Sequence, residues 1–144
     1  MRPYANAWWA VLARDDGCYG RRANDETLLI VQIETAEAVA AAEEMAALDG
    51  LDGLFVGPND LSSSLDVWPP VWDNQPAAFA EAIARIPVVA HAHGKAAGIM
   101  VPDATIANRC IAQGYDFISL SNDASLLERA ARAELAAIAG RRQS

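Results

Sequence analysis

The sequence has few cysteines and few basic residues, and each shortage excludes a class of protein. The two cysteines, Cys18 and Cys110, fit neither a zinc-ligand spacing nor a disulfide framework, so two free thiols are expected. Lysine and arginine total 11 against 19 acidic residues, for a formal net charge of −8. The basic residues do not cluster, so nucleic acids and anionic membranes would repel the chain.

Long apolar segments are also absent. No run approaches the roughly 20 apolar residues of a membrane span, and the first residues lack the basic, apolar and small-residue order of a signal peptide. We therefore predict a soluble, cytoplasmic protein with no membrane partner. At 144 residues and 53% hydrophobic side chains, the chain should form one domain over residues 1–144, with an irregular segment at 1–27.

From residue 28 to about 140, short apolar runs alternate with longer amphipathic stretches. This order predicts an α/β fold of four βα units, in which helices cover a parallel sheet. Residues 57–60 (GPND) read as a turn, and residues 88–90 fit either a helix or a small extra strand. The predicted strands are 28–33, 54–56, 96–101 and 117–120, and the predicted helices are 35–48, 77–85, 104–113 and 123–139.

Two architectures use this order of elements, an open doubly wound sheet and a (β/α)₈ TIM barrel. Polar residues stand at the C-terminal ends of several successive strands, which is typical of the barrel. Examples are Glu34 after the first strand, Asp60 after the second and Asn122 after the fourth. His91, His93 and Lys95 precede the third strand and should lie at the opposite rim. The loop with Trp68 and Trp72 could line a pocket or a subunit interface, or cover the outer core.

Glu34 and Asp60 are the strongest candidates for chemistry. Adjacent parallel strands would bring both carboxylates to one rim, where like charges require a counter-charge such as a hard divalent cation. The alternative is structural: Glu34 would start a helix and Asp60 would cap one, since acidic residues favour helix N-termini.

Four strings in this region resemble one family. They are VQIET at 31–35, GLDGLFVGPNDLSSSL at 50–65, GKAAGIM at 94–100 and SND at 121–123. In order and spacing they are similar to the HpcH/HpaI aldolases, metal-dependent 2-keto-3-deoxy acid and 2,4-dihydroxyhept-2-ene-1,7-dioic acid aldolases that are related to the citrate lyase beta family. The resemblance covers about residues 23–135 and corresponds to the C-terminal half of a phosphoenolpyruvate/pyruvate-type barrel.

The resemblance implies a role for each site residue. Glu34 and Asp60 would hold Mg²⁺, Mn²⁺ or Co²⁺, Gln32 would help to hold pyruvate, and the backbone of Pro58 and Asn59 would receive the substrate carboxylate. The implied reaction is aldol cleavage of a 2-keto acid to pyruvate and an aldehyde, in which the metal stabilises the enolate. No Schiff base on Lys95 is implied.

The family's catalytic arginine and histidine lie in its first half and have no match here, so no catalytic residue is assigned. A TIM barrel needs eight strands and about 250 residues, and four strands would leave open edges and an apolar concave face. We therefore expect a homo-oligomer or a complementing N-terminal half. Two alternatives stay open: a CoA-thioester lyase of the citrate lyase beta type, and a non-catalytic metal-binding or assembly module.

Overall fold

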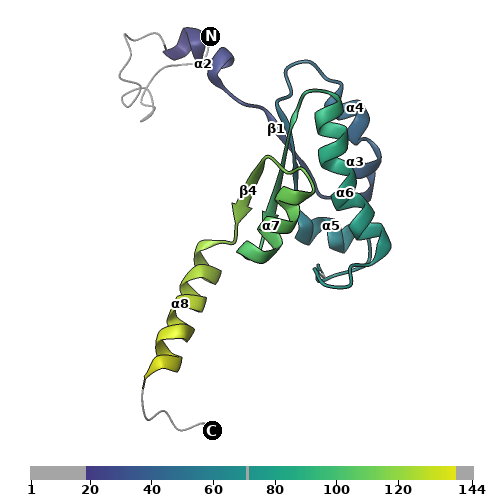
Figure 1. Ribbon diagram of the computed structural model, residues 1–144. Helices are drawn as coiled ribbons and strands as arrows, with labels where there is room; N and C mark the ends of the chain where they lie inside the picture. Colours follow the sequence, from purple (N-terminus) through teal and green to yellow (C-terminus); the bar gives the residue numbers. More distant parts are fainter. Residues whose placement is uncertain (1–18, 71, 139–144) are drawn as a thin grey trace.

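A four-stranded parallel sheet forms the centre of the computed structural model, which describes residues 19–70 and 72–138 (Figure 1). Its strands lie side by side in chain order, β1-β2-β3-β4, and helices alternate with them. The strands are β1 (Ile30–Ile33), β2 (Gly53–Val56), β3 (Ala96–Val101) and β4 (Phe117–Leu120). The helices are α2 (Tyr19–Glu26), α3 (Ala36–Ala40), α4 (Ala42–Ala46), α5 (Pro58–Ser64), α6 (Ala77–Ala92), α7 (Ala104–Ala112) and α8 (Asp123–Ala137).

The register of the strands brings their C-terminal ends to one rim. Ile33 pairs with Val56, Val56 with Ile99, and Val101 with Leu120. Residues that directly follow these strands therefore gather on the same side of the molecule. The predicted α/β fold with parallel strands is confirmed, and it places the candidate site residues at this rim.

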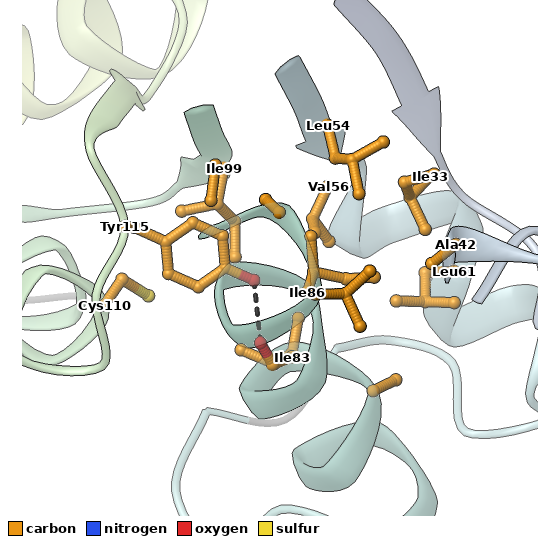
Figure 2. Packing of buried hydrophobic residues seen from close by; sticks show 14 of the residues in the cluster. Ile33, Ala42, Leu54, Val56, Leu61, Ile83, Ile86, Ile99, Cys110 and Tyr115 are labelled. Atoms are coloured by element: carbon orange, nitrogen blue, oxygen red, sulfur yellow. Dashed lines mark hydrogen bonds between the residues drawn. The ribbon is translucent and has the colours of Figure 1, made fainter. Parts of the chain in front are cut away.

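The hydrophobic core lies between one face of the sheet and the helices. Alternate strand residues such as Ile33, Leu54, Val56 and Ile99 point into it and are fully buried, and helix residues such as Ile86 meet them (Figure 2). This alternation follows from the two-residue period of a strand. The opposite face holds Gln32 and other side chains that are half-buried or exposed, so this face of the sheet is less covered than the core face.

Helix α6 continues through Pro87, which settles the ambiguous segment 88–90 as helix. A proline within a helix removes the backbone N–H that would bond to the carbonyl four residues earlier, here that of Ile83. The hydroxyl of buried Tyr115 donates to this carbonyl at 2.8 Å (Figure 2). Tyr115 thus supplies the hydrogen bond that Pro87 cannot, and burial raises the pKa of its hydroxyl.

Several element bounds differ from the prediction. The expected helix 35–48 is two short helices, α3 and α4, that meet at Ala41. Residues 58–60 begin helix α5 rather than forming only a turn, because Pro58 occupies the first helical position, where its missing N–H costs nothing. Helix α2 forms within the segment 1–27, which we expected to be irregular. The remainder of that segment, residues 1–18, lies outside the described residues.

Helix α8 extends away from the sheet (Figure 1), and none of its residues is buried. Leu126, Leu127 and Leu135 recur along this helix, but they do not pack on the core: Leu127 is 73% exposed. Among the described residues, no helix has the length and apolar character needed to cross a membrane.

Candidate metal and keto-acid site

The rim at the C-terminal ends of the strands carries all five predicted site residues. Gln32 lies in β1, and Glu34 directly follows that strand. Pro58, Asn59 and Asp60 follow β2 and form the first turn of α5. The N-cap of this helix is Gly57, so Asp60 is not its cap. The structural role expected for an ordinary capping aspartate therefore does not account for Asp60.

Four of these residues line one cavity of about 180 Å³. Its wall contains Gln32 from β1 and the run Gly57 to Asp60 from the start of α5. The other lining residues are Phe55, Met100 and Ser119. The cavity is large enough for a hydrated cation or a three-carbon acid, and it contains an exposed carboxylate and an exposed amide at its edge.

Glu34 lies beside this cavity, across Gly57. A Cβ atom placed on Gly57 would stand 3.2 Å from Oε2 of Glu34 and 2.8 Å from Nε2 of Gln32. The backbone at Gly57 has a φ of −98°, which any residue adopts, so glycine is needed here for space and not for conformation. Gln32 of β1 and Glu34, which directly follows that strand, thus both lie against the turn that leads to Asp60.

One aromatic side chain, Phe55, lines the cavity. The rings of Phe55 and Phe117 stack with centroids 5.6 Å apart. Phe117 fits because the residue beneath it is Gly98, where a Cβ would lie 2.2 Å from the ring. Sequence analysis did not identify Phe55, Met100 or Ser119 as site residues. Their strand positions alternate with the buried core positions, and this two-residue period was the signal available.

A second hollow of about 510 Å³ adjoins the first and shares Pro58, Asn59 and Met100 with it. The tryptophan loop forms one wall, and the start of α8 forms another. Both tryptophans line this hollow. Trp68 is 61% exposed, and Trp72 also packs against the core, edge-on to Phe79 at 5.9 Å.

The donors at the rim suit a hard divalent cation. Glu34 and Asp60 offer carboxylate oxygens, and Mg²⁺ and Mn²⁺ prefer oxygen ligands. Within residues 19–70 and 72–138, no group of three or more histidine, cysteine, aspartate or glutamate side chains could hold a metal. Mg²⁺ usually keeps several waters and is bound through one or two carboxylates, so two carboxylates at this rim are compatible with such a cation.

The histidines lie at the other rim, as predicted. His91 Nε2 lies 2.8 Å from Oδ2 of Asp116, and His93 Nε2 lies 2.7 Å from Oε1 of Glu43. Asp116 also accepts a hydrogen bond from the backbone N–H of Ala97. These bonds lower the pKa of Asp116. Both histidines thus join elements at the N-terminal ends of the strands.

Comparison with known proteins identifies relatives over most of the chain. A family model described as HpcH/HpaI aldolase/citrate lyase matches residues 9–130. A pyruvate aldolase of Rhizobium etli is 40% identical over 116 residues, which are 80% of this chain and 44% of that protein. The chain spans about half the length of the curated relatives it matches.

Two solved structures of related proteins resemble this chain. An HpcH/HpaI aldolase/citrate lyase family protein from Burkholderia cenocepacia superposes with a TM-score of 0.80 at 34% identity, covering 94% of this chain and 52% of that one. A citrate lyase beta subunit from M. tuberculosis, complexed with oxaloacetate and magnesium, gives a TM-score of 0.59 at 21% identity, covering 71% of this chain and 50% of that one, which shows a common fold.

Proposed function

This chain belongs to the HpcH/HpaI aldolase/citrate lyase family, and we propose that it forms the metal- and pyruvate-binding part of a class II aldolase. The reaction would cleave a 2-keto-3-deoxy acid to pyruvate and an aldehyde. The pyruvate aldolase from Rhizobium etli supports the choice of carbon–carbon lyase chemistry on a pyruvate-type substrate.

One observation carries the proposal: residues from two neighbouring strand ends converge on the cavity of about 180 Å³. Gln32 and Asp60 line it, and Glu34 touches the shared Gly57 turn from the β1 side. A cation site explains why this rim concentrates negative charge.

Each residue would have a defined part in binding. Glu34 and Asp60 would hold the divalent cation, which when bound supplies the positive charge that stabilises an enolate. Gln32 would orient the keto acid, and the start of α5 at Pro58 and Asn59 would receive its carboxylate. The Phe55 ring, which lines the cavity and stacks on Phe117, would exclude water from one side, which strengthens the electrostatic contacts in the cavity.

The open face of the sheet would be covered in the working enzyme. Within the described residues, β1 and β4 are edge strands, and Ile30 beside the cavity face is 40% exposed. Unpaired strand edges and apolar surface favour association. We propose that further βα units, from a second copy of the chain or from a complementing N-terminal half, close the barrel and supply the catalytic arginine and histidine of the family.

Calorimetric titration with Mn²⁺ and then pyruvate tests this function. The wild-type chain should bind both, and Glu34→Gln with Asp60→Asn should abolish metal binding and the pyruvate binding that depends on it. Each change removes charge but keeps side-chain size. Thermal melting should show that the double variant is folded.

The outcome separates the candidate functions. Failure of a folded wild type to bind Mn²⁺ would overturn the proposal. Where binding is present, cleavage of 2-keto-3-deoxy acids by the closed assembly supports the aldolase, whereas turnover of acyl-CoA thioesters alone would indicate the lyase alternative.

A further inference from the structure

The hydroxyl of Ser64 connects the two segments that carry Glu34 and Asp60. Its oxygen accepts a hydrogen bond of 2.9 Å from the backbone N–H of Ala36. Ala36 is the first residue of α3 and stands two positions after Glu34, while Ser64 is the last residue of α5, whose first turn holds Asp60. The bond therefore bridges the β1 side of the rim to the β2 side.

The neighbouring hydroxyls make bonds within their own elements. Thr35 accepts from the N–H of Ala38 and caps α3. Buried Ser62 donates to the carbonyl of Asn59 within α5, at 2.7 Å. Ser63 is exposed, and its side chain makes no hydrogen bond within the described part of the chain. Of these four hydroxyls, that of Ser64 is the one that crosses between the segments.

A second hydrogen bond connects α5 to the end of β1. The N–H of Gly57, at the start of α5, donates to the carbonyl of Ile33 at 3.1 Å. The inner face of α5 is held by packing, since Leu61 and Ser62 are fully buried. The bond from Ala36 to Ser64 adds a link at the other end of the helix. The two bonds thus connect both ends of α5 to the segment on either side of Glu34.

We propose that Ser64 is a positioning residue that fixes the separation of the Glu34 and Asp60 carboxylates for a divalent cation. This inference rests on the metal site of the proposed function. Residues that orient ligands without touching the metal typically change metal affinity by roughly 10- to 100-fold. Ser64 acts through the backbone, so removal of its hydroxyl is expected at the lower end, at about tenfold weaker binding.

A purely structural role would look different, because Ser64 also satisfies a free N–H at the start of α3. Loss of such a bond destabilises the helix whether or not a metal binds. Thr35→Ala provides the matched comparison, since it removes a capping bond from the same helix without touching the link to α5. Ser63→Ala is the same substitution as Ser64→Ala at the adjacent position.

The experiment measures Mn²⁺ affinity of the full chain by calorimetry, with electron paramagnetic resonance of the bound ion as a second readout. Ser64→Ala should weaken Mn²⁺ binding about tenfold and broaden the bound-ion spectrum. Ser64→Thr keeps the hydroxyl and should bind Mn²⁺ with wild-type affinity. Ser64→Val, in which valine has the shape of threonine but no hydroxyl, should not. Ser63→Ala and Thr35→Ala should stay within about twofold of the wild type. Amide hydrogen exchange at Ala36 should accelerate in Ser64→Ala and Ser64→Val only.

The results that would overturn the role of Ser64 differ from those that would overturn the proposed function. Wild-type affinity in Ser64→Ala or in Ser64→Val would overturn the positioning role, and so would equal losses in Ser64→Ala and Thr35→Ala, which indicate helix stability alone. If Ser64→Ala does not fold, the comparison of Ser64→Thr with Ser64→Val decides the question. Failure of the wild type itself to bind Mn²⁺ would overturn the proposed function and the inference together. Binding lost in Glu34→Gln with Asp60→Asn but kept in Ser64→Ala would overturn the inference alone.

Discussion

Gly57→Ala should damage the candidate site far more than it damages the fold. The added methyl would lie 2.8 Å from Nε2 of Gln32 and 3.2 Å from Oε2 of Glu34. Both side chains reach the surface, so they can move aside, and the overpacking should cost about 1 kcal/mol. Alanine is also a poorer N-cap than glycine, which adds up to about 1 kcal/mol. A fall in Tm of roughly 5 °C is expected in total.

The displaced groups are those proposed to bind the cation and the keto acid, so affinity should fall more than stability. Calorimetry with Mn²⁺ and pyruvate should show at least tenfold weaker binding, since small shifts of ligand-orienting groups cost about that much. The side-chain amide resonance of Gln32 in a ¹⁵N–¹H spectrum should also shift, whether or not a metal is present.

Gly53→Ala is the matched control. It is the first residue of β2, the strand that Gly57 directly follows, and lies at the end remote from the site, where a Cβ would approach the carbonyl of Ala96 at 3.0 Å. It should lower Tm without changing Mn²⁺ affinity by more than about twofold. The reasoning would be refuted if Gly57→Ala bound Mn²⁺ and pyruvate like the wild type and left the Gln32 resonance unmoved.

Two predictions concern the scaffold. Tyr115→Phe should lower the free energy of unfolding by about 1–3 kcal/mol, because it leaves the buried carbonyl of Ile83 without its donor. In a Pro87→Ala background the cost should be smaller, because residue 87 then supplies a backbone N–H to the carbonyl of Ile83. Urea unfolding of the wild type, the two single variants and the double variant measures this coupling, and additive losses would contradict the explanation. Asp116 has a lowered pKa because the N–H of Ala97 and the ring of His91 bond to its carboxylate. It should therefore stabilise the fold above the ordinary aspartate pKa and lose that contribution as pH falls through its lower folded value. The contribution should be about 1 kcal/mol, since the side chain is 45% exposed. Urea midpoints of Asp116→Asn should fall less steeply with pH than those of the wild type between pH 5 and about pH 2, and parallel curves would contradict this.

Sequence patterns located the strands because apolar runs bounded by glycine and proline leave few alternatives. The bounds of β3 and β4 match the prediction. The predicted first strand began two residues early, since Leu28 and Leu29 are apolar yet 70% and 56% exposed. Composition cannot distinguish an apolar residue that pairs in the sheet from one just before it. Pro87 was harder still, because its place inside α6 depends on Tyr115, which lies 28 positions later in the sequence.

The candidate site likewise contains residues whose positions could be predicted from the sequence and residues whose positions could not. The rim positions of Glu34 and Asp60 were predictable because a residue that follows a parallel strand must lie at the shared rim, wherever the helices pack, whereas Gln32 was singled out by the family resemblance. Gly57 and Ser64 were not, because their contacts with Gln32, Glu34 and Ala36 exist only after β1 and α5 pack together. The groups proposed to contact the ligand are therefore placed by local order along the chain, whereas the groups proposed to set their separation are placed by packing. If Ser64 and Gly57 act as proposed, substitutions invisible to motif inspection should reduce metal affinity while both carboxylates remain in place.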